Sequence, residues 1–353
     1  MTSPIDGAAW SGKNVFITGV CGTIGRELLT NLCGLNVAGI VGVDTNETEL
    51  ASVREQLRSD QRVQLYLCDI RMSQELARRM EDADIVLHAA AYKHVDICEH
   101  SPHEAILTNI IGTQNVIAAA RESGVERVIF TSSDKAVNPT SVMGTSKLMG
   151  ERLMSAASSQ TPKGKPIFTS IRFGNVMGSR GSVVPRFKSQ IAAGGPVTLT
   201  DRNMTRFIMS IDQAAKLVMD AVFLARGGEV IVTKMPVLRI EDLAAVMIEE
   251  LAPKFGRTPS QIKIDIIGSK PGEKMYEELT NEEEVRRTFD WGKYLVVKPA
   301  LETNVRDRFD AWEKEGKPLD QPYNSALSPA MNREEIEAFF RHAGLNDLVE
   351  TYA

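Results

Sequence analysis

Short apolar runs alternate with segments of helical period over the first 175 residues of this 353-residue chain. The runs are rich in valine and isoleucine and are nearly continuous, which is typical of strands buried on both faces of a sheet. We expect such strands at Asn14–Thr18, Ala38–Asp44, Val63–Asp69, Ile85–Ala89, Arg127–Ser132 and Ile167–Phe173.

Between these runs, apolar residues recur every three or four positions, which predicts amphipathic helices. Strands that alternate with helices form a parallel sheet covered on both faces, so we predict an α/β fold with a Rossmann-type doubly wound parallel sheet. The helices are expected at Thr23–Cys33, Glu47–Ser59, Ser73–Arg79, His103–Ser123 and Ser141–Ala157.

The pattern loosens after Gly178 and predicts a smaller mixed α/β domain over residues 179–300, interleaved with the Rossmann domain of residues 13–178. Residues 1–12 are expected to form a tail, and residues 301–353 a C-terminal extension. In the smaller domain and the extension we expect helices at Pro185–Ala192, Ile211–Leu224, Ile240–Phe255 and Arg333–Gly344, and strands at Val197–Thr200, Glu229–Val232 and Ile262–Ile266.

The composition of the chain excludes several classes of protein. A formal net charge of -5 with 25% charged residues leaves no basic stripe for nucleic-acid phosphates or anionic lipid. The longest apolar stretch, near 35–43, is too short to span a bilayer, so we expect no transmembrane segment and a soluble, cytoplasmic protein. The four cysteines have no spacing of a disulfide framework or metal site. Nor do the four neighbouring histidines and nearby carboxylates match a ligand signature, and we predict no metal: His88, His94, His100, His103, Asp96 and Glu99.

A glycine-rich turn, Thr18-Gly19-Val-Cys-Gly22-Thr23-Ile24-Gly25, links the first predicted strand to the first helix. Glycines there let the backbone approach a pyrophosphate, and the helix N-terminus supplies unpaired N–H donors. Asp44 ends the second strand, where a carboxylate binds ribose hydroxyls and repels a 2′-phosphate, which favours NAD over NADP. A tight turn with a capping aspartate and no ligand is the alternative.

Residues after the next two strands complete the predicted cofactor site. Asp69 and Ile70 end the third strand, and Ala89, Ala90 and Ala91 follow the fourth. These positions flank the adenine and a ribose in a dinucleotide-binding sheet, and small residues there leave room for the cofactor. Residues 13–178 are therefore predicted to be the NAD-binding domain.

The segment after the fifth strand reads Ser133-Asp134-Lys135, and Met143-Gly-Thr-Ser-Lys147 follows as a Tyr-x-x-x-Lys pair without its tyrosine. Methionine cannot exchange a proton, so Asp134 and Lys135, at the sheet edge where ligands bind, are the candidate acid and base. That predicts elimination as well as hydride transfer. Lys147 shares a helix face with Met143 and can hold the nicotinamide ribose. Alternatively, Asp134 caps a turn, Lys135 is solvated and Met143 packs in the core.

These segments together resemble the extended short-chain dehydrogenase/reductases, and among them the nucleotide-sugar 4,6-dehydratases that act on UDP-N-acetylglucosamine in bacterial polysaccharide biosynthesis. The resemblance covers about residues 13–300. Besides the glycine turn and the Ser133 segment, it rests on Asp69-Ile-Arg71, His88-Ala-Ala-Ala-Tyr-Lys93-His94, Thr108-Asn109-Ile-Ile-Gly112, Arg172-Phe-Gly-Asn175, Met204-Thr-Arg206-Phe, Lys234-Met-Pro and Pro271-Gly-Glu273-Lys274-Met-Tyr-Glu277-Glu278.

The resemblance implies a reaction. NAD accepts a hydride from sugar C4, Lys135 removes the C5 proton, Asp134 protonates the departing C6 hydroxyl, and the hydride returns to C6. Ser133 is implied to position the C4 hydroxyl or to relay its proton. These roles need a neutral lysine and a protonated carboxyl, which burial favours and mutual proximity opposes.

This chain matches the methionine branch of those enzymes, which implies retention at C5. It departs from that branch in two features: Ser133 stands where threonine is common, and the N-terminal membrane helices of better-known members are missing. Serine keeps the hydroxyl, and the missing helices bear on location. The resemblance also implies a homo-oligomer, a dimer or higher, paired through the two long helices near 103–123 and 141–157.

Binding residues are implied by family position. Asn109 joins Lys147 among the cofactor contacts, while Asn175 and Arg206 would contact the diphosphate. The other predicted substrate contacts, each of which is equally well a surface or core residue, are Lys93, His94, Lys188, Thr198, Thr200, Glu273 and Lys274. Two other functions stay open: a nucleotide-sugar epimerase or reductase, and a non-catalytic NAD-binding protein, which would not need the tyrosine.

Overall fold

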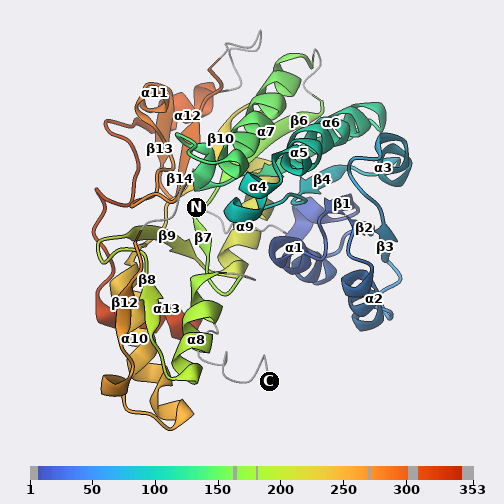
Figure 1. Ribbon diagram of the computed structural model, residues 1–353. Coiled ribbons are helices and arrows are strands. Elements are labelled where there is room, and N and C mark those ends of the chain that lie inside the picture. The colour runs from blue at the N-terminus through green and yellow to red at the C-terminus, as the bar shows by residue number, and fades with distance from the viewer. Residues whose placement is uncertain (1–6, 162–164, 180–181, 269–271, 301–308, 344–353) are drawn as a thin grey trace. The chain divides into compact units, whose positions relative to one another are not determined.

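The computed structural model describes residues 7–161, 165–179, 182–268, 272–300 and 309–343 (Figure 1). The chain divides into two compact units. The first comprises residues 1–172, 215–234 and 280–322, and the second comprises residues 173–214, 235–279 and 323–353. Parts of the predicted tail and C-terminal extension, residues 1–6, 301–308 and 344–353, lie outside the described residues.

A ten-stranded sheet runs through the first unit in the order β15-β13-β14-β10-β6-β5-β4-β1-β2-β3. The pairs from β3 to β10 are all parallel, so the predicted Rossmann-type fold is confirmed. Its parallel strands are β1 (Asn14–Thr18), β2 (Gly39–Asp44), β3 (Val63–Leu67), β4 (Ile85–His88), β5 (Arg127–Thr131), β6 (Ile167–Arg172) and β10 (Val230–Thr233).

Three further strands extend this sheet in antiparallel fashion and were not predicted: β14 (Tyr294–Val297), β13 (Thr288–Trp291) and β15 (Lys317–Pro318). Gly292, at a φ of 71°, turns the chain between β13 and β14. Each strand is only two to four residues long, so its pattern of apolar and polar positions is too short to identify.

Helices cover both faces of the sheet (Figure 1). Apolar side chains of α3, α6 and α7 pack with strand residues such as Phe16 and Phe130 in one buried cluster. Helix α1 lies on the opposite face with α9. The helices of these layers are α1 (Thr23–Cys33), α2 (Glu47–Gln56), α3 (Ser73–Met80), α6 (Gly112–Glu122), α7 (Val142–Ser159) and α9 (Ile211–Leu224).

The helix predicted over residues 103–123 is confirmed in position, but it is not one uniform α-helix. The chain forms α5 (Pro102–Ala105), a π-helical segment (Ile106–Ile111) and then α6. An apolar period does not reveal a π-segment, which carries one extra residue per turn. The helix predicted to continue to Phe255 ends at Leu251 instead, because Pro253 lacks an N–H and starts a 3₁₀ turn.

The second unit is a mixed α/β structure. It holds a three-stranded sheet, β11 (Val237–Arg239), β9 (Thr205–Met209) and β7 (Asn175–Val176), and a pair of strands, β12 (Ile264–Ile266) and β8 (Val197–Leu199). Three helices bury their apolar faces against each other: α8 (Val183–Ala193), α10 (Ile240–Leu251) and α13 (Arg333–His342). The remaining helices of the described residues are short: Gly7–Trp10, α4 (Val95–His100), Asp134–Ala136, Pro259–Gln261, α11 (Glu282–Val285) and α12 (Asp310–Glu315).

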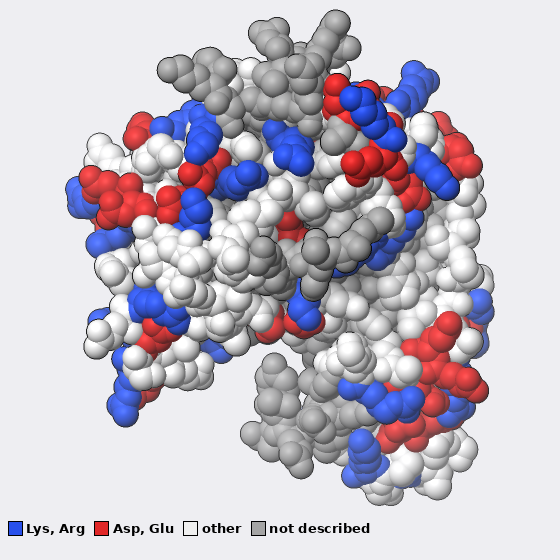
Figure 2. All heavy atoms as spheres, turned by 180° about the vertical axis from the view of Figure 1, so that it is seen from behind, with Lys and Arg blue, Asp and Glu red and all other residues white. Residues whose placement is uncertain are grey.

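Basic and acidic side chains are interspersed on the face drawn in Figure 2. Within the described ranges, no helix combines the length and the apolar character needed to cross a bilayer.

Candidate functional site

The glycine-rich turn between β1 and α1 packs so tightly against neighbouring backbone atoms that residues larger than glycine do not fit. A Cβ on Gly19, whose φ is 69°, would lie 2.7 Å from the Cα and N of Ala90. A Cβ on Gly25 would lie 2.1 Å from the carbonyl oxygen of Gly19. Gly22, at the N-terminus of α1, has no side chain that could cap the helix, so the N–H groups of the first turn, which includes Thr23 and Ile24, face a position suited to a phosphate.

Asp44 stands beside this turn at the end of β2. Its Oδ2 accepts a hydrogen bond from the Cys21 N–H at 2.9 Å, and its Oδ1 accepts one from the Asn46 N–H at 3.0 Å. A carboxylate has about four acceptor positions, so further ones remain for two ribose hydroxyls. The turn, the N-terminus of α1 and this fixed carboxylate fit the pyrophosphate and a ribose of a dinucleotide.

The structure places the next predicted cofactor residues at the same end of the sheet. Asp69 accepts hydrogen bonds from Arg71 at 2.7 and 2.9 Å; burial works to raise the pKa of this carboxyl, but the Arg71 contacts hold it below its usual range. Ile70 is buried against Gly112. The N–H groups of Ala89 and Ala90 donate to the carbonyl and hydroxyl of Thr18, respectively, which joins the segment of the three alanines to the glycine turn.

Asp134 and Lys135 form an ion pair just beyond β5. The Lys135 Nζ lies 3.0 Å from Oδ2 and 3.2 Å from Oδ1 of Asp134. The Asp134 side chain is 4% exposed, whereas that of Lys135 is 36% exposed. Ser133 caps this 3₁₀ turn by accepting from the Lys135 N–H, and its hydroxyl donates to Asp134 Oδ1 at 2.6 Å.

Lys147 is buried on α7 and donates to the carbonyl oxygen of Thr131 at 2.8 Å. Burial lowers the pKa of its amine to about 8, an effect that the charge of Glu151 opposes. Helix α7 approaches the Asp134 turn through Gly144, where a Cβ would lie 2.3 Å from the Lys135 carbonyl oxygen. The structure therefore brings the predicted catalytic residues together at one edge of the sheet.

Met143 lies in an apolar cluster. Its side chain is 3% exposed and packs with Cys98 and Ala105, against which Val95 and Val142 also pack. For this residue, the structure supports the core alternative.

Asn109, predicted to bind the cofactor, lies in the π-helical segment and is 2% exposed. Its Oδ1 accepts from the Tyr92 N–H, and its Nδ2 donates to the Tyr92 carbonyl and to Ser146 Oγ. Lys93 and His94 follow Tyr92 as exposed residues at the start of α4.

A buried charge network, which the sequence did not predict, lies next to the turn of Ser133, Asp134 and Lys135. Arg172 contacts Glu151 at 2.6 Å and Glu284 at 2.8 Å, and Ser132 donates to Glu151 at 2.6 Å. Burial works to lower the pKa of Arg172, but the two carboxylates raise it above its ordinary value. The one local signal was Glu151, an acidic residue one helical turn after Lys147 on the buried face of α7.

In the second unit, several predicted substrate residues meet at one buried carboxylate, Glu277. Asn175 Nδ2 donates to its Oε1 at 2.6 Å, and Arg206 Nε lies 3.3 Å from the same oxygen. Arg206 also donates to the carbonyl of Lys274 at 2.9 Å. Glu273 lies 4.0 Å from Arg206 and accepts from Thr200, so these residues form one cluster.

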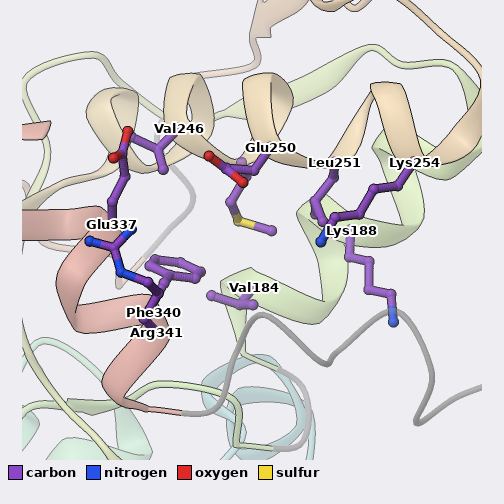
Figure 3. Close-up of a pocket in the computed structure, with 10 residues that line it drawn as sticks. Val184, Lys188, Val246, Glu250, Leu251, Lys254, Glu337, Phe340 and Arg341 are labelled. Carbon is purple, nitrogen blue, oxygen red and sulfur yellow. The ribbon is translucent and has the colours of Figure 1, made fainter. Parts of the chain in front are cut away.

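Lys188 and Thr198 lie outside that cluster of direct contacts. Thr198 accepts hydrogen bonds from Arg186 and Gln190. Lys188 lines a pocket between α8, α10 and α13, and Figure 3 shows its side chain beside that of Lys254. No other predicted substrate residue is among the described residues that line this pocket: Val184, Lys188, Val246, Met247, Glu250, Leu251, Lys254, Glu337, Phe340 and Arg341.

Comparison with known families gives a match over most of the chain. A family described as polysaccharide biosynthesis protein matches residues 15–299. An uncharacterised membrane protein of Methanocaldococcus jannaschii is 45% identical, over 94% of this chain and 96% of that protein. The capsular polysaccharide biosynthesis protein CapD of Staphylococcus aureus is 39% identical over 86% of this chain, which spans only 52% of CapD. A UDP-glucose 4-epimerase of Rickettsia akari is 36% identical, over 92% and 94%.

Solved structures share the fold. The protein Pen of Bacillus thuringiensis superposes with a TM-score of 0.86 at 39% identity, over 94% of this chain and 98% of Pen. DesIV of Streptomyces venezuelae, a dTDP-glucose 4,6-dehydratase solved with NAD, gives a TM-score of 0.66 at 19% identity, over 93% and 97%. At that identity, DesIV supports only the likeness of fold.

Proposed function

The chain belongs to the polysaccharide biosynthesis protein family of extended short-chain dehydrogenase/reductases, and from that premise we propose that it is an NAD-dependent nucleotide-sugar 4,6-dehydratase. The proposed substrate is UDP-N-acetylglucosamine, and the proposed product is its 4-keto-6-deoxy derivative with the C5 configuration retained. The observation that carries the proposal is the Asp134–Lys135 ion pair just beyond β5, the strand whose last residue, Thr131, accepts a hydrogen bond from the buried Lys147.

The pair supplies the two groups that an elimination needs. In the dehydratase reaction a base removes the proton at C5 and an acid protonates the leaving C6 hydroxyl, and each group contributes roughly 10²- to 10⁴-fold to the rate. Asp134 and Lys135 are adjacent in sequence and bonded to each other, so both can reach neighbouring carbons of one sugar. Epimerisation at C4 requires no acid for a leaving group at C6.

The ion pair also explains how each group acquires its unusual protonation state. The reaction needs a neutral Lys135 and a protonated Asp134, which differ from the ion pair by one proton moved from Nζ to Oδ2 over 3.0 Å. The net charge of the pair does not change in this transfer, so no isolated charge is left in the partly buried site. Water exclusion by a bound sugar favours the neutral form of the pair, because an ion pair loses more solvation than two neutral groups do.

Lys147 and Ser133 serve the first half of the reaction in this proposal. Bound NAD supplies a hydride acceptor at C4 and later the hydride donor at C6. Lys147, anchored on the Thr131 carbonyl, offers remaining donors to the nicotinamide ribose and lowers the cost of a developing alkoxide. Ser133 positions the C4 hydroxyl and relays its proton towards solvent. Lys135 returns a proton to C5 as the hydride adds to C6, and one proton taken from solvent then restores the pair at the end of the cycle.

Mass spectrometry tests the proposed function. UDP-N-acetylglucosamine incubated with the protein and NAD should lose one water with no net formation of NADH. The proton NMR spectrum of product formed in deuterated water should show solvent deuterium at C5 and the retained configuration. An unchanged mass with UDP-, GDP- and CDP-sugars alike would contradict the proposal.

A 4-epimerase is the second candidate, because the Rickettsia relative of that name covers nearly the whole chain. An epimerase leaves the mass of the sugar nucleotide unchanged and moves only the C4 hydroxyl. Chromatographic separation of the UDP-sugars in the same reaction distinguishes the two activities: a dehydrated product supports the dehydratase, and an isobaric epimer supports the alternative.

A further inference from the structure

His88 ends β4 and is fully buried, with an exposed fraction of 0%. Its ring contacts two threonine hydroxyls: Thr18 Oγ1 lies 2.7 Å from Nδ1, and Thr113 Oγ1 lies 3.0 Å from Nε2. Neither the predicted catalytic residues nor the predicted cofactor contacts include this histidine. Because each nitrogen of this buried ring has a hydrogen-bond partner, the orientation of the ring is fixed. The groups that it contacts therefore indicate its role.

The hydrogen bonds of the two threonines determine the tautomer of the ring. Thr113 donates its single hydroxyl hydrogen to the carbonyl oxygen of Asn109 at 2.7 Å, so it can only accept from His88. Nε2 of His88 therefore carries the hydrogen. Thr18 accepts from the Ala90 N–H at 3.2 Å and has its own hydrogen left to donate to Nδ1. Burial, and then the charge of Lys147, holds the pKa of this imidazole far below its ordinary value, so the ring is neutral and these bonds make it the Nε2–H tautomer.

The same bonds continue on both sides of the ring into the proposed site. On one side, Thr18 is the last residue of β1 before the glycine turn, and Ala90 belongs to the predicted cofactor contacts. On the other side, Asn109 donates to Ser146 Oγ at 2.9 Å, and Ser146 donates to the Met143 carbonyl in the first turn of α7. Lys147 is the next residue of that helix.

We propose that His88 is a positioning residue, which sets the first turn of α7, and with it Lys147, relative to the cofactor-binding turn. It acts through the chain Ala90, Thr18, His88, Thr113, Asn109, Ser146, and it touches neither sugar nor cofactor. Met143 has no hydroxyl that could bind a substrate and so fix the position of α7. The position of this helix therefore depends on contacts made inside the protein. The kinetic part of this inference rests on the proposed function, whereas its structural part does not.

Two variants of His88 test the role. His88→Phe keeps a ring of similar size and removes both hydrogen bonds. His88→Gln keeps one acceptor and one donor on a single amide. With NAD and UDP-N-acetylglucosamine saturating, we expect His88→Phe to lower kcat by roughly 10- to 100-fold, because a misplacement of about 1 Å has an effect of that size. It should also weaken NAD binding measured by calorimetry, and His88→Gln should recover most of both losses.

Thr169→Val is the matched control, since it removes another fully buried hydrogen bond of the first unit, from Thr169 to Glu229 at 2.9 Å. If His88→Phe reduces kcat and NAD affinity no more than Thr169→Val does at a comparable loss of Tm, the ring is only part of the core and the proposal is overturned. The same holds if His88→Gln recovers neither quantity.

A spectroscopic measurement on the unmodified protein tests the tautomer of His88 independently of the kinetics of the variants. The nitrogen NMR spectrum of protein labelled at its five histidines should contain an Nε2–H tautomer signal that is lost in His88→Gln. An Nδ1–H tautomer or an imidazolium at neutral pH overturns the proposal. If the unmodified protein dehydrates no sugar nucleotide, the proposed function fails, and the tautomer and the NAD affinities still decide the role of His88.

Discussion

Gly144 and Lys135 are packed so closely that a Cβ on residue 144 would lie 2.3 Å from the Lys135 carbonyl oxygen. The contacting atom is backbone, so it cannot rotate away as a side chain does. This closeness holds the first turn of α7 against the turn that carries Asp134 and Lys135, and it links the register of the helix to the geometry of the ion pair.

Gly144→Ala adds only one methyl group, but it should reduce the activity strongly. Displacement of α7 from the Lys135 carbonyl is expected to destabilise the fold by about 1–3 kcal/mol, as overpacking does, and to lower kcat by at least roughly 10-fold. Urea unfolding and steady-state kinetics measure the two effects. Gly7→Ala is the control, because among the described residues a Cβ there meets only Leu35, at 3.8 Å. Full activity in Gly144→Ala would show that α7 can move without effect on the site.

Replacement of each member of the ion pair should separate the steps of the reaction. Lys135→Met is expected to abolish incorporation of solvent deuterium at C5, and Asp134→Asn to lower the rate of water loss by roughly 10²- to 10⁴-fold while C4 oxidation continues. NMR of the sugar and absorbance of transient NADH follow these steps. Lys165→Met, at an exposed lysine that pairs with Glu126, is the control. Deuterium at C5 in the Lys135→Met product would assign the base to another residue.

Met143→Tyr restores the sequence of a Tyr-x-x-x-Lys pair and should not restore its chemistry. The side chain at this position lies in an apolar cluster with Cys98 and Ala105, so we expect a phenol there to be buried in that cluster rather than to reach a sugar. We expect kcat to stay the same or fall, and stability to fall by about 1–3 kcal/mol. Met143→Leu, which keeps the volume, should cost less than about 1.5 kcal/mol. A higher kcat in the tyrosine variant would show that this side chain reaches the substrate.

The sequence could predict those parts of the site that depend only on which residues follow the end of a strand. Asp44 ends β2 and Asp134 follows β5, and the ends of parallel strands meet at one edge of the sheet whatever the rest of the chain does. The Arg172–Glu284 contact could not be predicted, because it joins residues 112 positions apart and neither has a local pattern that names its partner. The π-helical turn at Asn109 was missed because it shifts the helical period by a single residue.

The activity should decline on the alkaline side as Lys147 loses its proton. Burial lowers the pKa of this amine to about 8, against the opposing charge of Glu151. If the Lys147 cation binds the nicotinamide ribose and stabilises negative charge at O4 of the sugar, the logarithm of kcat/KM should fall with unit slope above about pH 8. Glu151→Gln removes the opposing charge, so the decline should begin at a lower pH. A profile that stays level up to the ordinary lysine pKa of 10.5 would contradict a role for the charged amine.

Stability should fall in mild acid because His88 resists protonation in the fold. Burial, and then the charge of Lys147, lowers the pKa of this imidazole from 6.5 to about 3. Between these two values the unfolded chain takes up a proton that the folded protein does not. The free energy of unfolding should thus lose up to about 1.4 kcal/mol per pH unit as the pH falls from 6.5 towards 3. Urea unfolding at pH 7, 6 and 5 would measure this slope. His88→Gln has no titrating ring, so the difference between its slope and that of the unmodified protein isolates the histidine. Equal slopes in the two proteins would mean that His88 is protonated as readily in the fold as in the unfolded chain.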